Sequence, residues 1–232
     1  NPVYANWGCF YYTLPDGTDS STITQANMSS SSSPYTVYQE GIYNGYYYAE
    51  TRYEDKMFNK ANVDDAGYRF NYYETMSYPF GYGLSYTTFD YSDFKLVSYD
   101  ALKDTYNFSI KVTNTGEVAG KDAVQLYLQK PYTQYDVDNK VEKSAIELVA
   151  FNKTDILEPN QSEVVEISVE GKYMASYDSY NAKTYILDKG DYYFAFGRDS
   201  HDAINNVIKA KNSSITTEAK GRTTLGSSDF AH

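Results

Sequence analysis

Residues 104–116, "DTYNFSIKVTNTG", alternate apolar and polar side chains in the pattern that predicts a β-strand with one buried face. The apolar residues occupy every second position and would share that face: Tyr106, Phe108, Ile110 and Val112. The Asn-Thr-Gly that ends the segment is typical of a turn, because Asn and Gly adopt turn conformations readily. The segment therefore predicts a half-buried strand followed by a turn.

The same alternation recurs six more times between residues 89 and 197. The clearest repeats are "KDAVQLYLQK", "SEVVEISVE" and "GDYYFAFG", and weaker ones are "FDYSDFKLVSYD", "KSAIELVAFNKT" and "KTYIL". "EGKYMASYDS" is read as a single helical turn that crosses between two sheets. About seven strands in about 115 residues, with almost no helical periodicity, are typical of an immunoglobulin-like β-sandwich. The sequence thus predicts a mainly β chain.

The regions on either side of these strands are less regular. Residues 35–55, "YTVYQEGIYNGYYYAETRYED", are rich in Tyr and interrupted by Gly41 and Gly45, which favours short strands or a strand and a turn over one helix. Residues 56–77 are expected to form a surface excursion that returns to the core near Tyr78. After residue 200, "VIKA" is predicted as an extra edge strand, and the polar remainder as a disordered tail or linker.

Composition and charge exclude several classes of function. The chain of 232 residues carries 31 acidic and 20 basic residues, a net charge of -11 that repels nucleic acid and anionic lipid. It contains no apolar run of the length needed for a membrane-spanning helix. Cys9, His201 and His232 are not spaced as metal ligands, so no metal or other cofactor is expected. The opening "NPVYANWGCF" indicates a piece of a larger protein, and nothing specifies a compartment.

Residues 78–89, "YPFGYGLSYTTF", place aromatic rings where Pro and Gly interrupt the backbone. Together with "VYQEGIYNGYYYAETRYED", "VTNTGEVAGKDAVQLYLQKP" and "LDKGDYYFAFGRDS", this motif resembles the C-terminal part of glycoside hydrolase family 3 enzymes, the β-glucosidase group. In that family a barrel domain is joined to an α/β sandwich domain, which leads into a fibronectin type III-like sandwich.

The resemblance implies a division of the chain into three parts. Residues 1–85 would be the C-terminal segment of the α/β sandwich domain, 86–200 the fibronectin type III-like β-sandwich, and 201–232 a polar tail or linker. The domain junction would consist of Pro79, Phe80, Gly81, Tyr82, Gly83 and Leu84. There the glycines would let the backbone turn tightly, and the rings would fill the interface between the domains.

The chemistry of the family lies outside this sequence. Retaining glycosidases use two carboxylates that flank the scissile bond, one as nucleophile and one as acid or base. In family 3 the nucleophile Asp lies in an S-D-W-like stretch and the acid/base Glu near an S-E-G-x-D-R-like stretch, and neither stretch occurs here. Two similar triplets, Ser92-Asp93-Phe94 and Ser228-Asp229-Phe230, lack the barrel context and are read as solvated residues. No catalytic residue is therefore assigned.

One charged cluster stands out in the first 85 residues: Glu40, Glu50, Arg52, Glu54 and Asp55. One interpretation is that these side chains support a sugar subsite, with Arg52 paired to a carboxylate. The simpler interpretation is a structural network of ion pairs.

Two hypotheses of function follow. The first is a non-catalytic C-terminal portion of a β-glucosidase-like enzyme, with the remaining barrel and α/β domains as partners and an oligosaccharide as the substrate of the whole enzyme. The alternative is an independent carbohydrate-binding or adhesion module that uses the tyrosines of "GIYNGYYY" and "KPYTQYDVDN".

Overall fold

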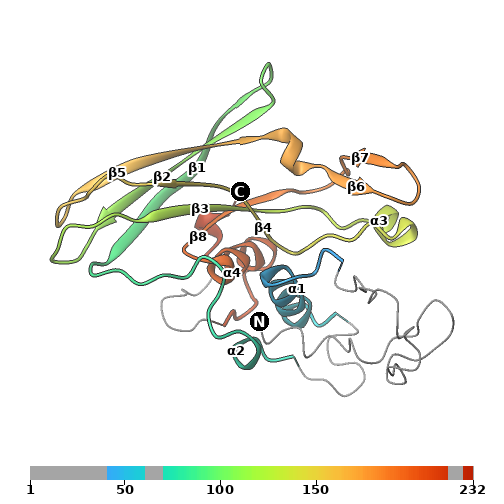
Figure 1. Cartoon of the computed structure of the whole chain (residues 1–232), viewed down its shortest axis with the longest axis horizontal. Coiled ribbons are helices and arrows are strands. Elements are labelled where there is room, and N and C mark those ends of the chain that lie inside the picture. The colour runs from blue at the N-terminus through green and yellow to red at the C-terminus, as the bar shows by residue number, and fades with distance from the viewer. Residues whose placement is uncertain (1–40, 61–69, 219–226, 232) are drawn as a thin grey trace, which may run out of the picture.

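The structure is a computed structural model that describes residues 41–60, 70–218 and 227–231. Two helices come first, α1 (Tyr46–Met57) and the short α2 (Tyr72–Thr75), and strands then dominate. The other helical elements are α3 (Gln134–Asn139), α4 (Ser200–Lys211) and two 3-10 turns, η4 (Gly171–Met174) and η5 (Ser228–Phe230). Figure 1 shows the strands stacked above α1, α2 and α4.

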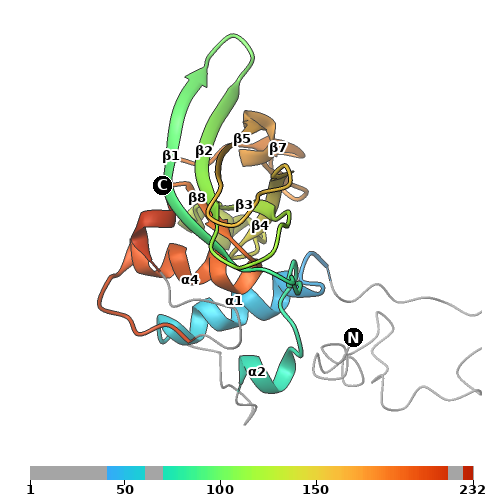
Figure 2. The same ribbon diagram turned by 90° about the vertical axis from the view of Figure 1, so that its left-hand side faces the viewer.

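Six strands form two antiparallel sheets of three strands each. One sheet has the order β1 (Phe89–Asp100), β2 (Thr105–Asn114) and β5 (Ser162–Glu170). The other has the order β4 (Glu147–Lys153), β3 (Ala123–Gln129) and β8 (Tyr193–Gly197). A separate hairpin pairs β6 (Ser176–Asp178) with β7 (Thr184–Ile186), and β1 and β2 form a long ribbon that rises away from the helices in Figure 2.

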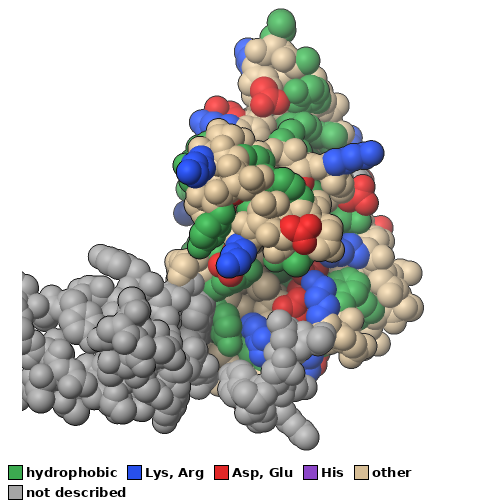
Figure 3. Space-filling view, turned by 90° about the vertical axis from the view of Figure 1, so that its right-hand side faces the viewer, with side chains coloured by type: hydrophobic (Ala, Val, Ile, Leu, Met, Phe, Trp, Pro, Cys, Tyr) green, Lys and Arg blue, Asp and Glu red, His purple; other side chains and the backbone are tan. Residues whose placement is uncertain are grey.

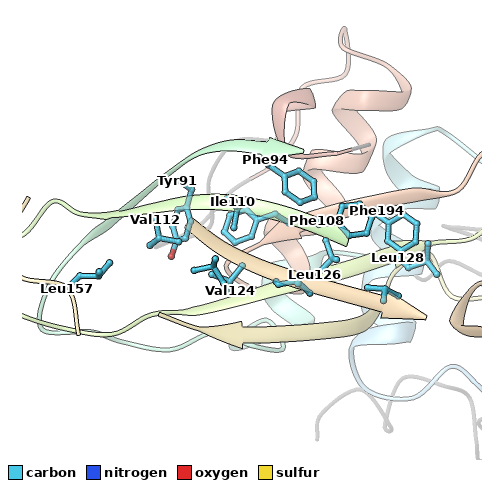
Figure 4. Close-up of a cluster of buried hydrophobic side chains, with 14 residues drawn as sticks. Tyr91, Phe94, Phe108, Ile110, Val112, Val124, Leu126, Leu128, Leu157 and Phe194 are labelled. Atoms are coloured by element: carbon cyan, nitrogen blue, oxygen red, sulfur yellow. The ribbon is translucent and has the colours of Figure 1, made fainter. Parts of the chain in front are cut away.

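The two sheets share one apolar core, drawn in Figure 4. β2 contributes Phe108, Ile110 and Val112, three of the residues whose alternation predicts this strand. The opposite sheet contributes every second residue of β3 and β8: Val124, Leu126, Leu128, Phe194 and Phe196. Side chains at these positions point to the same face of their strand, so period-two patterning is sufficient to build this core.

The sheet β4-β3-β8 is buried on its second face as well. Tyr127 of β3 and Ala195 of β8 point away from the first core and pack against Ile204 and Ile208 of α4. Tyr53 of α1 belongs to the same second cluster. The fold therefore has three layers, a sheet, a second sheet and a layer of helices, as Figures 1 and 2 show from two sides.

The prediction of a mainly β chain is confirmed. All seven predicted strand segments contain a strand, and the predicted helical turn is η4, while the short β6 comes in addition. Residues 56–77 contain the end of α1 and all of α2, and Phe70 and Tyr72 are buried. Residues 61–69 of this segment lie outside the described residues.

Two local predictions are wrong. The described part of residues 35–55 forms the helix α1 rather than strands, because its buried face consists of Ala49, Glu50, Tyr53 and Glu54 at helical spacing. "VIKA" lies within α4 and forms no edge strand. The interpretation of residues 201–232 as a polar tail or linker is therefore wrong for its first part, where every residue from Ser200 to Ile208 is buried.

Candidate functional site

Helix α1 carries four of the five residues of the predicted charged cluster. Glu50 and Glu54 are four positions apart and lie together on its buried face, and Asp55 is half-buried beside them. Arg52 is two positions from each glutamate, which on a helix directs its side chain away from theirs. Glu40 lies outside the described residues. The structure therefore divides the cluster instead of gathering it at one site.

Glu54 and Asp55 form an ion-pair network with lysines from other parts of the chain. Lys211, at the end of α4, places Nζ 2.8 Å from Glu54 Oε1, and Gln129 Nε2 donates to the same oxygen over 3.0 Å. Lys60 pairs with Asp55 over 3.0 Å. Burial opposes the charge of Lys60, but the carboxylates of Glu54 and Asp55 outweigh it and raise the pKa of Lys60.

This network forms one wall of a cleft of about 630 Å³ between α1 and the sheet β4-β3-β8. Three tyrosines line the cleft, Tyr43, Tyr132 and Tyr193. Burial and then the Glu142 carboxylate raise the pKa of Tyr43 to about 12, so its hydroxyl stays protonated and donates to Lys143 O over 3.2 Å. Figure 3 views the molecule from the side of α3 and the β6–β7 hairpin, where basic and acidic side chains lie interspersed.

Lys143 lines the cleft and connects several loops around it. Its ammonium lies 2.8 Å from Asp136 Oδ2 and 2.6 Å from Asp188 Oδ2, and it also donates to Pro131 O over 2.9 Å. Asp136 in turn caps α3 by accepting from the backbone N–H of Thr133 over 2.6 Å. A buried lysine with two carboxylates and a carbonyl is fully engaged, so Lys143 fixes the loops around the cleft.

A second polar cluster lies inside the helical layer, and no motif in the sequence predicts it. His201 Nδ1 is 2.9 Å from Glu50 Oε2, and because a carboxylate only accepts, Nδ1 carries the hydrogen. Glu50 Oε1 accepts from Tyr72 OH over 2.6 Å and from Ser200 Oγ over 2.8 Å. The ring of Tyr72 stacks on that of His201, with centroids 3.8 Å apart. Glu50 and His201 are completely buried, so this cluster joins α1, α2 and α4 in the interior of the helical layer.

Asp199 lies next to this cluster as the N-cap of α4 and accepts from the backbone N–H of Asp202 over 2.8 Å. Burial raises the pKa of Asp199 to about 6, although the hydrogen bond from Asp202 opposes the change. The polar side chains that begin α4 are thus held inside the molecule by specific partners.

The predicted junction is held firmly through its backbone. Phe80 O accepts from the backbone N–H of Ser200 over 2.8 Å, and Gly81 O accepts from Gln125 Nε2 over 3.1 Å. Gly81 has φ +86°, and a Cβ there would meet the Gln125 side chain, so glycine is required. The ring of Phe80 stacks on Tyr46 of α1 with centroids 4.4 Å apart.

Tyr78 and Leu84, in the same segment, are more exposed than Phe80. Tyr78 and Tyr82 stack on each other, with ring centroids 5.2 Å apart. Tyr78 is exposed, Leu84 is 88% exposed, and Tyr86 just beyond the junction is fully exposed. Phe80 thus contacts α1 and Tyr82 is partly buried, and the prediction that the rings fill an interface between domains stays a prediction.

The other candidate residues named from the sequence lie away from the cleft or outside the described residues. Asp93, at a bulge of β1, and Asp229, in η5, are both exposed, which fits their interpretation as solvated residues. His232 and Cys9 lie outside the described residues. Across residues 41–60, 70–218 and 227–231, no three His, Cys, Asp or Glu side chains are grouped to hold a metal ion. No helix in these same ranges has the length and apolar character needed to cross a membrane.

The two carboxylates that α1 contributes to the cleft are already paired with lysines. A retaining glycosidase needs one carboxyl as proton donor and a second as nucleophile on opposite sides of a glycosidic bond. Glu54 and Asp55 are instead adjacent on α1, and both are paired with lysines. Paired carboxylates of this kind orient neighbouring groups and accept hydrogen bonds.

Comparison with known proteins identifies the strand-rich part of the chain. Residues 122–200 match the family described as the fibronectin type III-like domain. The chain is 35% identical to beta-glucosidase A of Butyrivibrio fibrisolvens, over 72% of this chain and 19% of that protein. It is 30% identical to thermostable beta-glucosidase B of Acetivibrio thermocellus, over 77% of this chain and 20% of that protein.

Solved structures agree with these relatives. Beta-glucosidase 3B from Thermotoga neapolitana, in complex with α-D-glucose, has a TM-score of 0.50 at 34% identity and covers 70% of this chain with 18% of its own. A beta-glucosidase from Paenibacillus barengoltzii has a TM-score of 0.54 at 32% identity and covers 71% of this chain with 16% of its own.

The chain therefore carries a fibronectin type III-like domain. Its resemblance to glycoside hydrolase family 3 enzymes of the β-glucosidase group, in the part that includes this domain, is confirmed. The chain spans about a fifth of the length of the curated relatives it matches, 19% and 20% for the two described above.

Proposed function

We propose that this chain is a non-catalytic, C-terminal portion of a family 3 β-glucosidase-like enzyme. In this proposal it supports the catalytic domains, which hydrolyse terminal β-glycosidic bonds of oligosaccharides. Residues 1–85 would complete an α/β sandwich domain, and residues 86–200 would form the β-sandwich module that packs beside it. The oligosaccharide would meet its two catalytic carboxylates in the remaining barrel and α/β domains.

The observation that carries this proposal is the junction, a segment with a fixed backbone at whose end Leu84 and Tyr86 are exposed within the described residues. The backbone of Phe80 and Gly81 is fixed by hydrogen bonds to α4 and β3, so the segment is ordered in advance. The side chains of Leu84 and Tyr86 are nevertheless exposed to solvent. Exposed apolar side chains on a preorganised backbone are typical of a surface that packs against another domain.

Two further findings support a role without catalysis. The sequence lacks the stretches that carry the family's nucleophile and acid/base. The carboxylates on α1 are engaged by Lys60, Lys211 and His201. Both findings are expected if the reacting groups belong to other domains.

The test uses the longer enzyme that the proposal implies and compares two exposed leucines. Leu84→Asp should lower its free energy of unfolding by about 2–3 kcal/mol, because Leu84 would be buried against a neighbouring domain. Leu102→Asp, at the fully exposed tip of the β1–β2 ribbon, should change it by less than about 0.5 kcal/mol. Equal effects of the two substitutions would remove the support that the junction gives to the proposal.

A further inference from the structure

The two Tyr-rich motifs of the sequence meet at one place in the structure. Tyr43 comes from "GIYNGYYY" and Tyr132 from "KPYTQYDVDN", and both line the cleft between α1 and the sheet β4-β3-β8. They are close enough for Tyr132 to contribute to the raised pKa of Tyr43. Tyr193 of β8 provides a third ring. The motifs thus supply the aromatic walls of one cleft, although they are far apart in the sequence.

Polar side chains with fixed positions line the same cleft. Gln129 is buried and donates from Nε2 to both Glu54 Oε1, over 3.0 Å, and Ala145 O, over 2.6 Å. Its Oε1 accepts from Lys211 Nζ over 2.8 Å. Thr51 is fixed nearby because its hydroxyl accepts from the backbone N–H of Ala145 over 2.9 Å. Side chains held in this way need no rearrangement before they bind a ligand.

The charges that line the cleft indicate what kind of ligand fits. Each of its four lysines already has at least one carboxylate partner, at 3.0 Å for Lys60, 3.2 Å for Lys130, 2.6 Å for Lys143 and 2.8 Å for Lys211. An anion would have to displace these carboxylates, and a cation would have to displace the ammonium groups from Glu54 and Asp55. Asp191, the other carboxylate of the lining, is exposed to solvent. A neutral ligand with many hydroxyls does neither, because each hydroxyl can donate to a carboxylate or amide oxygen and accept from an ammonium group.

We infer that this cleft binds a neutral oligosaccharide. Sugar rings would pack against Tyr43 and Tyr132, and their hydroxyls would bond to the network of Glu54, Gln129 and Lys211. The volume of about 630 Å³ falls within the range of small-molecule sites. The choice of a saccharide over other neutral polyols rests on the proposed function, and the cleft would give that enzyme a place to hold a glycan chain.

The experiment is an NMR titration of the whole chain with cellobiose, cellotetraose and xylotetraose. Saturable shifts with a millimolar Kd are expected, since a few ring contacts and hydrogen bonds supply affinity of that order. Tyr132→Ala should weaken binding about tenfold. Tyr132 is 59% exposed, so its removal leaves the core intact.

Tyr180→Ala is the matched control, because Tyr180 is 66% exposed and lies in the turn between β6 and β7, outside the cleft. It should leave the Kd unchanged. No saturable shift with any of the three sugars would overturn the inference, and so would an equal loss for both variants. Either result leaves the proposed function standing, because that proposal is tested by the longer enzyme and not by sugar binding to this chain.

Discussion

Replacing Glu50 with Ala tests the buried cluster that joins the three helices. Its carboxylate accepts from Tyr72, Ser200 and His201 at 2.6, 2.8 and 2.9 Å, and Glu50 and His201 are completely buried. Alanine leaves all three donors without that acceptor. Each unsatisfied buried donor costs about 1–3 kcal/mol, so the three together would cost about 3–9 kcal/mol. Because the substitution also removes the unfavourable desolvation of Glu50 itself, we expect the lower part of this range.

Glu50→Ala should therefore lower the free energy of unfolding by about 3–5 kcal/mol. Urea denaturation followed by circular dichroism measures this value, provided that the slope of the transition is unchanged. Glu50→Gln keeps one acceptor oxygen and should lose less. Glu117→Ala, at an exposed position, should stay within about 0.5 kcal/mol of the wild type. A similarly small effect of Glu50→Ala would refute the view that this cluster holds α4 in place.

Three further predictions concern other contacts in the described structure. Lys143→Met leaves two carboxylates without their cation and should cost about 3–5 kcal/mol in denaturation, whereas the same change at the half-exposed Lys121 should cost less than about 0.5 kcal/mol. The pKa of Asp199 is about 6 in the folded protein against an ordinary 3.8, so the folded state binds more protons than the unfolded state between these values. The stabilisation from Asp199 is therefore fully present below pH 3.8, and the free energy of unfolding falls by about 3 kcal/mol as the pH rises through 6. Asp199→Asn should flatten this part of the stability curve, and an unchanged curve would contradict the assignment. Gly81→Ala should lower the free energy of unfolding more than Gly45→Ala, because both residues have positive φ but only at Gly81 would a Cβ meet another side chain. Equal losses would contradict this prediction, because they would mean that the Gln125 side chain moves away from the Cβ without an energetic penalty.

The strands could be predicted from the sequence because their pattern is local. The alternation in β2 and β3 reports directly on which residues face the shared core. The second buried face of β3 was less visible, because Tyr127 and the two glutamines beside it look like solvent-facing residues. They are buried because helices distant in the sequence cover them.

The sequence does not predict α1 and α4 because polar residues occupy part of their buried faces. On α1 the inward positions include Glu50 and Glu54, whose partners Ser200 and Lys211 lie about 150 residues further along the chain. On α4 the apolar residues Ala203, Ile204, Val207 and Ile208 do have helical spacing, and Asp199 is a typical N-cap. The polar residues between them, Asn205 and Asn206, obscure this helical spacing.

The candidate site could be predicted only in part. Glu54 and Asp55 were identified as a charged cluster, and they do form an ion-pair network. Lys143, Gln129 and Lys211 were not identified, because each lies in a different segment and only the fold brings them to one cleft. Charge density along a sequence shows that ion pairs exist, whereas their partners depend on tertiary structure.

The central claim is that this chain supports glycoside hydrolysis without performing it. The most direct test is an assay of the purified chain against aryl β-glucosides, in parallel with the longer enzyme in which it would lie. The proposed function predicts turnover by the longer enzyme and none by the chain alone. Turnover by the chain alone, at a rate that falls when Glu54 or Asp55 is replaced, would contradict it and would locate a catalytic pair on α1.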